Sequence, residues 1–411
     1  MDRRVVVTGL GVISPIGNTV EDFWTSLKEG KSGISKIEGF DASDYTTRIA
    51  GEVKDFDYSN YLGRKDAKRM DRFTQFAVCA AGQALDDSGL DVTKIDMTRF
   101  GTILGSGIGG IGTLEEQHKR LLEKGPNRVS PFLIPMMISN MVSGHVSMQY
   151  GAKGPNTTVV TACASGTNAI GDAYHVIKRG DADYMFSGGA EASITPIGIS
   201  GFCTMKAMST RNDDPTKASR PFDKDRDGFV MSEGSGILIL EDYEHAKKRG
   251  AKIYGEIVGF GYTADAYHIT APAPEGEGGS RSMKMAMDTA GIKTSDVDYI
   301  NAHGTSTPLN DKFETMAIKN LFKEDAYKLV VNSTKSMAGH LLGASGAVEA
   351  IATLLSMKNS YVHRTLNHIE PDEGMDLDYV PKGKEMTVNY ALSNSLGFGG
   401  HNATLAFKKY E

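Results

Sequence analysis

One stretch, residues 157–177 (TTVVTACASGTNAIGDAYHVI), constrains the fold more than any other part of the chain. It opens with a β-branched run from Thr157 to Thr161, which favours a buried strand, and continues as a helical pattern that Gly180 ends. A turn of small residues joins the two. A strand that turns directly into a helix is the unit of α/β proteins, whose sites form at the carboxyl ends of the strands.

Cys163 lies in that turn, at the start of the predicted helix. The free N–H groups and the positive dipole end of a helix stabilise an anion, and a thiolate is one. The small neighbours leave space for a bulky reactant to approach the sulfur. The alternative is a buried, unreactive cysteine, because free cysteine is among the most buried residue types. The local sequence leaves both interpretations open.

The second part of the chain echoes this unit. A strand predicted over residues 329–333, a glycine turn and a helix led by Ser345-Gly346 repeat the pattern around Ser165-Gly166. Gly250 ends a charged helical segment over residues 241–249 and marks the boundary between the repeats. The predicted organisation is therefore two related α/β halves, residues 1–250 and 251–411.

Glycines punctuate both halves. Gly9 and Gly11 follow the strand-like Val5–Val7, and Gly259 and Gly261 follow a strand predicted over residues 253–258. We interpret both pairs as turns that end a strand. With 47 glycines and 13 prolines in 411 residues, the chain favours many tight strand–helix turns over disorder.

Composition excludes several classes of function. The net charge of −6 gives no general attraction to nucleic acid. No apolar run approaches the roughly 20 residues that a membrane-spanning helix needs, and the first residues show no signal peptide. The three cysteines lack metal-ligand spacing and make a disulfide framework improbable. We expect a cytoplasmic protein that binds neither nucleic acid nor membrane.

Two motifs resemble ligand loops only in part. The segment Gly105–Gly110 fits the dinucleotide pattern G-x-G-x-x-G, but no ribose-binding acid follows, which favours a tight packing turn. Asp223–Gly228 resembles the start of a calcium loop. Its twelfth position is Gly234, and Glu233 falls one residue short, so calcium binding is excluded.

Two surface-type segments allow a functional interpretation beside a structural one. Residues 64–72 (RKDAKRMDR) would place Lys65, Lys68, Arg69 and Arg72 on one face of a helix, either solvated or docking an acidic partner. The methionine-rich segment Pro131–Val142 predicts packing in the core or at a subunit interface, or a pocket for an alkyl chain.

Two histidines follow predicted strands. His303 comes just after Tyr299–Asn301, and His340 follows Lys335 after the second strand. A single histidine is usually structural, but two at strand ends together with a cysteine at a helix start indicate a site. Phe398, flanked by glycines, is suited to a mobile gate, and the alternative is a tight turn or bulge.

Four motifs in fixed order resemble one known family. They are TACASGTNA around Cys163, NAHGTSTP around His303, STKSMAGHLLGASGAVEA around Lys335 and His340, and SNSLGFGGHN around Phe398. Together they resemble the thiolase-related condensing enzymes of fatty-acid synthesis, the β-ketoacyl-[acyl-carrier-protein] synthases. The resemblance spans residues 5–410, and the presence of both histidines is typical of the elongating branch, synthase II.

The resemblance implies a thiolase-like, duplicated five-layer αβαβα fold and a cytoplasmic homodimer. The implied reaction is a decarboxylative Claisen condensation of malonyl-carrier protein with an acyl chain held on Cys163. No metal or other cofactor is required, because phosphopantetheine arrives on the acidic acyl carrier protein. The implied catalytic residues are Cys163, His303, His340, Lys335 and the gate Phe398.

The other implied residues fall into three groups. The first group binds substrate, and two of its members, Ile108 and Phe132, limit the length of the acyl chain. The second group docks the carrier protein. The third lies behind the catalytic groups or near a structural cation. The substrate group is Ile108, Phe132, Phe202, Thr270, Thr305 and Thr307; the docking group is Lys65, Lys68, Arg69 and Lys206; the third is Asn301 and Glu349. Many relatives have arginine at position 206, and lysine keeps the charge without the bidentate fork.

Four alternatives are weighed against this interpretation. A degradative thiolase needs a second cysteine in the C-terminal glycine loop, and residues 397–401 contain none. A cysteine hydrolase needs water at the acyl-enzyme, which the apolar surroundings oppose. A catalytically silent chain-length-factor subunit lacks the nucleophile that Cys163 supplies. A polyketide-type ketosynthase uses the same chemistry and is the hardest to separate.

Overall fold

A computed structural model describes residues 3–411, in which two halves share one topology. In the first half the strand order is β5-β4-β6-β7-β1, and in the second it is β10-β9-β13-β14-β8. The first three strands of each series are parallel and the last two pairings are antiparallel. The strands are β1 Val5–Ile13, β4 Phe100–Gly105, β5 Asn156–Val159, β6 Tyr184–Glu191, β7 Gly234–Asp242, β8 Gly255–Ala264, β9 Tyr299–Asn301, β10 Val330–Asn332, β13 Tyr390–Gly397 and β14 His401–Lys408, with the short β2 Ser35–Lys36, β3 Ile49–Ala50, β11 Tyr361–Val362 and β12 Lys384–Glu385.

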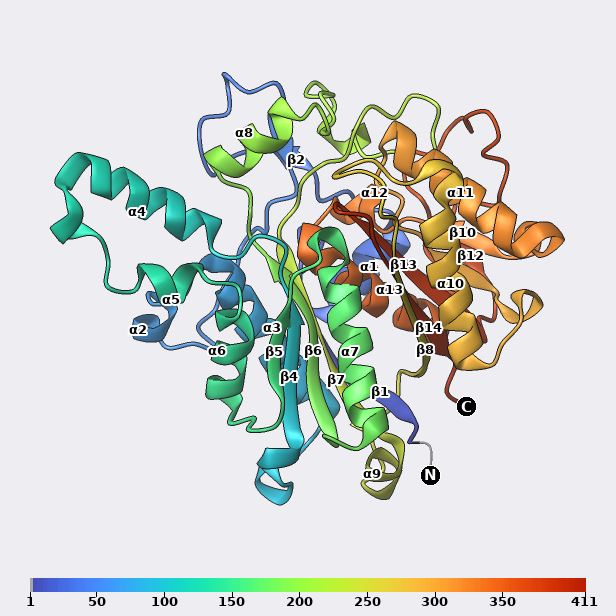
Figure 1. The fold of residues 1–411 in the computed structure, drawn as a ribbon, viewed down its shortest axis with the longest axis horizontal. Helices are drawn as coiled ribbons and strands as arrows, with labels where there is room; N and C mark the ends of the chain where they lie inside the picture. Colours follow the sequence, from blue (N-terminus) through green and yellow to red (C-terminus); the bar gives the residue numbers. More distant parts are fainter. Residues whose placement is uncertain (1–2) are drawn as a thin grey trace.

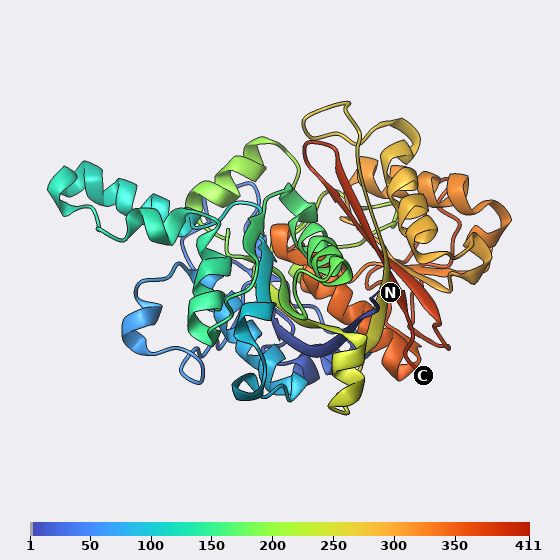
Figure 2. The same cartoon turned by 60° about the horizontal axis from the view of Figure 1, so that its bottom comes forward.

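The two halves lie side by side and join where β1 pairs with β8, with Val5 opposite Ile257. The first half occupies the left and the second the right in both views (Figures 1 and 2). The helices are α1 Val20–Glu29, α2 Arg64–Ala67, α3 Arg72–Ser88, α4 Ile111–Lys124, α5 Leu133–Met137, α6 Met141–Tyr150, α7 Ser165–Arg179, α8 Pro196–Thr204, α9 Tyr243–Lys248, α10 Glu277–Ala290, α11 Pro308–Phe322, α12 Lys335–Ala338 and α13 Ser345–Asn359.

Five layers result from this arrangement, as predicted. Helices α7 and α13 contact each other and the strands of both halves, so they form the middle layer between the two five-stranded halves of the sheet. Helix α3 covers the outer face of β1 and β7, and α10 covers that of β8 and β14. Every residue of α13 from Ser345 to Met357 is buried, which explains its lack of a polar face.

The glycine pairs predicted to end strands lie inside them instead. Strand β1 runs through Gly9 and Gly11, and β8 runs through Gly259 and Gly261. A Cβ at Gly9 would lie 2.1 Å from the Ala84 carbonyl oxygen, and one at Gly261 would lie 2.0 Å from that of Ser282. The glycines therefore let the outer helices approach the sheets closely, and the turn interpretation is wrong because packing, not chain reversal, requires them.

The strand before Cys163 is shorter and more exposed than predicted. Strand β5 covers Asn156–Val159 at the end of the sheet, with Asn156 and Thr157 exposed. Among residues 3–411 no strand pairs with its outer edge, so part of this β-branched run is exposed, although Val159 packs against the core. The following Val160 is 55% exposed.

Helices α4 and α5 form an arm that extends away from the rest of the molecule (Figures 1 and 2). The methionine-rich segment lies here and does not form core, since Phe132 and Ile134 are exposed. The charged helix α4 spans Ile111–Lys124. Among residues 3–411, no helix is long and apolar enough to span a membrane.

The boundary predicted at residue 250 falls between α9 and β8. The matching strand orders on either side support the proposal that residues 1–250 and 251–411 are duplicated units. One detail differs from the sequence prediction: Glu241 belongs to β7, where Arg249 binds its buried carboxylate, so the helix begins only at Tyr243.

Candidate active site

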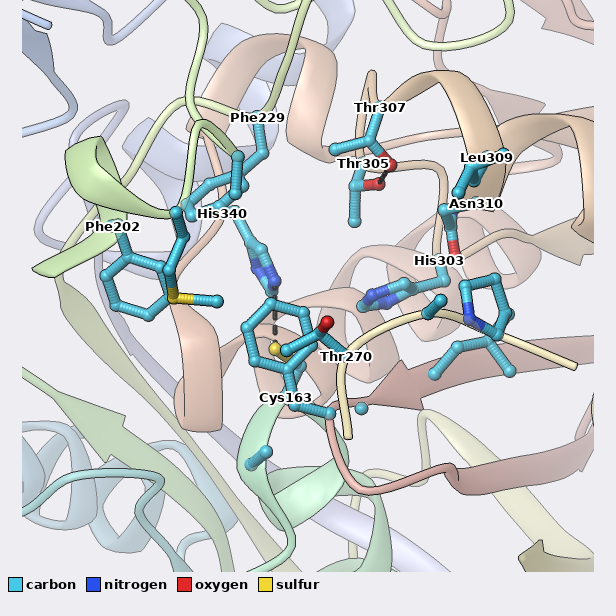
Figure 3. Close-up of a pocket in the computed structure, with 18 of the residues that line it drawn as sticks. Cys163, Phe202, Phe229, Thr270, His303, Thr305, Thr307, Leu309, Asn310 and His340 are labelled. Carbon is cyan, nitrogen blue, oxygen red and sulfur yellow. Dashed lines mark hydrogen bonds between the residues drawn. The ribbon is translucent and has the colours of Figure 1, made fainter. Parts of the chain in front are cut away.

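A cavity of about 550 Å³ collects side chains from both halves (Figure 3). Cys163 and Phe202 come from the first half, and His303, His340 and Phe398 come from the second. Cys163, His303 and Phe398 lie in the segments that directly follow β5, β9 and β13, so the site lies at the carboxyl ends of these strands. His340 follows the short helix α12 rather than a strand, and Phe202 lies within α8.

Cys163 is held at a strained turn before α7. Ala162, the residue before it, has φ 51°, a left-handed conformation that costs energy in a residue with a side chain. Two hydrogen bonds fix the turn: Thr161 N–H donates to Ser165 Oγ (2.9 Å), and Ser165 Oγ donates to the Ala162 carbonyl (2.6 Å). We call residues 161–165 the first elbow; it presents the sulfur to the cavity.

The second half contains a matching turn. Leu342 has φ 48°, a short 3₁₀ turn covers Leu342–Ala344, and α13 begins at Ser345. We call residues 341–345 the second elbow. Gly343 occupies the place that Cys163 has in the first elbow, so this copy carries no nucleophile.

His340 lies directly over the sulfur (Figure 3). Its Nε2 is 3.1 Å from Cys163 Sγ, and its Nδ1 is 2.8 Å from Ser345 Oγ. The ring of His303 is 5.3 Å from that of His340, with the planes nearly perpendicular at 85°. The Cys163 sulfur and one ring nitrogen from each of the two histidines therefore lie within 4.8 Å of one another, where they can act as bases or ligands.

Lys335 fixes His303 from behind. Its ammonium donates to the His303 carbonyl oxygen (2.7 Å), pairs with the Glu349 carboxylate and lies 3.3 Å from His303 Nδ1. An ammonium has only donors, so Nδ1 must accept, and we assign the ring proton to Nε2. His303 therefore offers an N–H donor to the cavity.

The carboxylate of Glu314 on α11 completes this support, because it accepts the backbone N–H of His303 and of Gly304, both at 2.8 Å. The sequence interpretation missed Glu314 and Ser345. Neither belongs to a pattern with a chemical signature, and each acts only through the residue that it contacts.

Burial controls the charges at the site. It raises the pKa of the Cys163 thiol to about 12, and the Lys335 ammonium and the Phe398 backbone N–H offset only part of this. Burial, aided by the Lys335 ammonium, holds the pKa of both His303 and His340 well below the usual range. The resting groups are thus a neutral thiol and two neutral imidazoles at pH 7. The expected thiolate at the helix start is not the resting form, since desolvation outweighs the favourable local field.

Phe398 lies at the tip of the hairpin between β13 and β14, the tight turn that the sequence left as an alternative to a gate. Gly399 (φ 84°) and Gly400 (φ 74°) take left-handed conformations in this turn. The Phe398 N–H points at the Cys163 sulfur, and the ring lies 6.4 Å from that of Phe202.

Most of the predicted substrate residues line the cavity. They are Ile108, Phe202, Thr270, Thr305 and Thr307, and the last two share a hydroxyl–hydroxyl hydrogen bond of 2.9 Å. Phe132 is not among the lining residues of this chain. It lies exposed at the start of α5, with the Arg69 guanidinium 4.9 Å from its ring centre.

The basic cluster does not form one helical face as predicted. Helix α2 ends at Ala67, and α3 begins at Arg72, whose guanidinium binds the Glu233 carboxylate. Lys65, Lys68 and Arg69 are exposed around this break, near α5 and α6 (Figure 1). Lys206 is exposed at the cavity mouth after α8, so one chain keeps the two parts of the predicted docking surface apart.

The two partial motifs serve internal contacts. The loop after β4 that resembles a dinucleotide fingerprint wraps its N–H groups around the Glu191 carboxylate. The Asp223 carboxylate accepts backbone N–H groups of Ile369 and Glu370.

Two buried oxygens near Lys335, Asn301 Oδ1 and Glu349 Oε2, have no hydrogen-bond partner. Oxygen donors without partners suit a hard cation, so these residues fit the structural ion that the family resemblance implies. Both lie behind the histidines rather than in the cavity.

Removal of Lys335 tests the ion pair that supports His303. In Lys335→Met the Glu349 carboxylate is buried without a partner, and we expect a loss of about 3–5 kcal/mol in the free energy of unfolding at pH 8. Burial already raises the pKa of Glu349 to about 7, so the folded state binds a proton below this pH that the unfolded state does not. Because the Lys335 ammonium lowers this pKa, its removal should raise the pKa of Glu349 further, so the loss should already shrink as pH falls from 8 toward 7.

Urea unfolding at pH 6 and pH 8 measures this effect. The double variant Lys335→Met/Glu349→Gln is the control, because it removes both charges and should recover most of the stability. A single variant as stable as the wild type at pH 8 would contradict the role of this ion pair.

Comparison with known proteins agrees with this geometry. Two family models match the chain: the N-terminal domain of β-ketoacyl synthases over residues 2–246, and the C-terminal domain over residues 254–368. The chain therefore belongs to the β-ketoacyl synthase family.

Curated relatives named 3-oxoacyl-[acyl-carrier-protein] synthase 2 match along the whole chain. One from Synechocystis sp. is 58% identical over 410 residues, and one from Staphylococcus aureus (strain COL) is 56% identical over 411; each match covers 100% of this chain and 99% of the relative.

Solved structures show the same fold. A type II polyketide ketosynthase in complex with its acyl carrier protein (AntDE:AntF) is 37% identical with a TM-score of 0.93, and a β-ketoacyl synthase from Burkholderia phymatum is 35% identical with a TM-score of 0.91. Both matches cover 100% of each chain.

Proposed function

We propose that this protein is a β-ketoacyl-[acyl-carrier-protein] synthase that lengthens fatty acyl chains by two carbons. One observation carries the proposal: a thiol, two neutral imidazoles and the N–H end of a hairpin converge on one cavity. This set can hold an acyl chain, stabilise an oxyanion and stabilise an enolate without a change of site.

Acylation comes first. Cys163 Sγ attacks the thioester carbonyl of an acyl-carrier protein while its proton passes to His340 Nε2, 3.1 Å away. The N–H groups of Cys163 and Phe398 are the proposed donors to the tetrahedral oxyanion. Collapse forms the acyl-Cys163 thioester and breaks the bond to the carrier, whose thiolate takes the proton from His340.

Condensation follows with malonyl-carrier protein. Thr305 and Thr307 line the route of the pantetheine arm and offer hydroxyls to its amides. Loss of CO₂ leaves an enolate, whose oxygen accepts N–H donors from His303 and His340. The carbanion attacks the acyl carbonyl, the Cys163 sulfur leaves and is protonated again, and the β-ketoacyl product departs on the carrier.

The structure supports a division of labour between the histidines. His303 is a fixed donor, because Lys335 occupies its Nδ1 side. His340 faces the Ser345 hydroxyl, which can accept from Nδ1 or donate to it. We propose that this hydroxyl lets His340 accept the thiol proton during acylation and donate Nε2–H during condensation.

Phe398 and the two chain-length residues are proposed to control entry. The hairpin tip has two glycines, so it can move Phe398 without strain elsewhere. Ile108 forms part of the cavity wall, whereas a role for Phe132 has no support from contacts within its own chain. Asn301 and Glu349 would hold a structural cation, which orders this support and takes no part in the bond changes.

The carrier protein is the proposed partner, and it supplies the phosphopantetheine that the chemistry needs. One structural relative is in complex with its own acyl carrier protein. Lys65, Lys68, Arg69 and Lys206 are exposed and complement an acidic partner.

Charge reversal tests this surface. Lys65→Glu/Lys68→Glu should raise KM for carrier-bound substrates about tenfold at low salt, with little change in kcat, because steering is electrostatic. The effect should diminish at high salt. Lys247→Glu/Lys248→Glu on α9, which lies apart from α2 at the bottom of Figure 1, is the control. A change in kcat alone would place the docking surface elsewhere.

A homodimer and a cytoplasmic location remain predictions. The free edge of β5, the exposed Val160 and the apolar arm residues such as Ile134 support a second copy as the covering partner. Sedimentation equilibrium should give twice the monomer mass, and a monomer at micromolar concentration would refute the dimer.

Intact mass spectrometry with decanoyl- and malonyl-carrier protein tests the function. We expect an acyl adduct on the protein and then a β-ketododecanoyl-carrier product. Free decanoate would indicate a hydrolase, and the absence of both adduct and product would support the silent-subunit alternative.

Polyketide ketosynthases use the same chemistry. The sequence identity to the 3-oxoacyl synthase 2 relatives is 56–58%, against 37% to the polyketide ketosynthase, and this difference favours fatty-acid elongation.

A further inference from the structure

Glu191, the last residue of β6, is a fully buried carboxylate that the proposed reaction does not use. Its Oε2 accepts the N–H of Gly107 (2.7 Å) and of Gly343 (3.0 Å), and its Oε1 accepts the N–H of Ile108 (3.2 Å). The hydroxyls of Ser106 and Ser193 also donate to Oε1, at 3.2 Å and 3.4 Å. These donors offset only part of the desolvation cost of the charge, so burial still raises the pKa of Glu191.

The carboxylate joins two segments that are far apart in the sequence. Gly107 and Ile108 belong to the loop after β4, and Gly343 belongs to the second elbow. A Cβ at either glycine would lie 2.8 Å from Glu191 Oε2, and one at Gly343 would lie 2.2 Å from Gly107 N. Only glycine lets both backbones approach the carboxylate this closely.

The second elbow explains why an anion is stable here. It repeats the backbone of the first elbow and leads into α13, whose N-terminal dipole end favours negative charge. In the first elbow the N–H of Cys163 is available to a reacting oxyanion. In the second, the N–H of the corresponding Gly343 binds the Glu191 carboxyl group, so an internal side chain occupies the equivalent position.

The loop held by Glu191 forms part of the cavity wall. Ile108 lines the cavity, and its backbone is fixed on one side by Glu191 and on the other by Gly109, whose N–H donates to Ser106 Oγ (3.2 Å). Displacing the carboxylate would free Ser106 and Ile108 together. It would also remove a charge that raises the pKa of Cys163 and release Gly343 in the second elbow, and these effects apply equally to acyl chains of every length.

We propose that Glu191 is a positioning residue that fixes Ile108 in the cavity wall and thereby limits the length of acyl chain that Cys163 accepts. This inference rests on the proposed function, since it concerns the acyl chain transferred to Cys163. Glutamine at position 191 keeps the shape but directs an amide N–H₂ at backbone donors, so the loop should loosen and longer chains should be accepted.

The test measures acylation of Cys163 by intact mass with carrier proteins loaded with C6, C10 and C16 chains. In Glu191→Gln, the C16:C6 ratio of kcat/KM should rise at least about fivefold over the wild type. Ser106→Ala is a milder variant of the same loop and should shift the ratio in the same direction. Ser187→Ala, on the same strand with its hydroxyl bound to the Ile103 carbonyl, is the matched control.

Hydrogen exchange gives a second readout that needs no substrate. The amides of residues 107 and 108 should exchange faster in Glu191→Gln and Ser106→Ala, and at the wild-type rate in Ser187→Ala. If both loop variants form the Cys163 adduct normally but keep the wild-type C16:C6 ratio of kcat/KM, this inference is refuted and the proposed function still stands. A wild type that forms no Cys163 adduct with any chain would overturn the proposed function and this inference with it.

Should Glu191→Gln fail to fold, Ser106→Ala carries the test, and an unchanged ratio in that variant refutes the proposal. Equal shifts in Ser187→Ala would also refute it, because they would show a general response of the strand rather than an effect of the carboxylate.

Discussion

Replacing Cys163 with serine should abolish formation of the acyl-enzyme. With the hydroxyl in place of the thiol, we expect the rate of acylation by decanoyl-carrier protein to fall at least about 10³-fold, because an alcohol is a much weaker nucleophile at neutral pH. The neutral His340 imidazole, 3.1 Å from the sulfur, can accept a thiol proton but is a poor base for an alcohol.

Intact mass spectrometry measures this loss directly. Cys203→Ala is the control: Cys203 is free and half-buried next to the cavity wall, but it does not line the cavity. It should be acylated as the wild type is. An undiminished adduct in Cys163→Ser would refute the assignment of the nucleophile.

Replacement of either histidine should impair decarboxylation more than acylation. His303→Ala removes a fixed N–H donor to the enolate, and we expect CO₂ release from malonyl-carrier protein to fall about 10²–10³-fold with acylation nearly intact. His340→Ala should lower decarboxylation similarly and also slow acylation, since its Nε2 contacts the thiol.

Two assays measure the two steps separately. CO₂ release from malonyl-carrier protein reports decarboxylation, and the mass of the acyl adduct reports acylation. Thr270→Ala is a suitable comparison for general effects of cavity mutation, because this residue lines the cavity but contacts neither histidine. Variants that lose acylation but keep decarboxylation would reverse the assigned roles.

His303 and His340 also set the lowest pH at which the wild-type enzyme keeps its full acylation rate. Because both histidine pKa values lie well below 6.5, both rings stay neutral at pH 6–8, and the acylation rate should not fall over this range. It should fall at lower pH, where protonated His340 can no longer accept the thiol proton.

The residues of the site were predictable because each lies in a local pattern with its own chemical logic. Cys163 at a strand–helix turn, and His303 and His340 after strands, follow from periodicity and turn composition, and four such motifs in order identified the family. The sequence also indicated the repeat, through the matching Ser-Gly helix starts at residues 165 and 345.

Contacts between distant segments were not predictable. Glu191 binds the backbone N–H of Gly343, 152 positions away in the chain, and no local pattern marks a residue whose partner is distant. Glu314 and Ser345 contact residues only 11 and 5 positions away, but neither stands in a motif with a chemical signature of its own. The glycines of β1 and β8 were misread for the same reason, because their requirement comes from α3 and α10 packing on them.

The sequence by itself determined the α/β class and predicted the two halves and the cysteine and histidines that meet in the cavity, since these depend on residue type and spacing along the chain. Only the tertiary structure decided how those groups are charged and oriented. Burial raises the pKa of Cys163 and lowers those of the histidines, and Lys335 fixes the His303 tautomer. Desolvation and hydrogen-bond geometry exist only once both halves enclose the cavity.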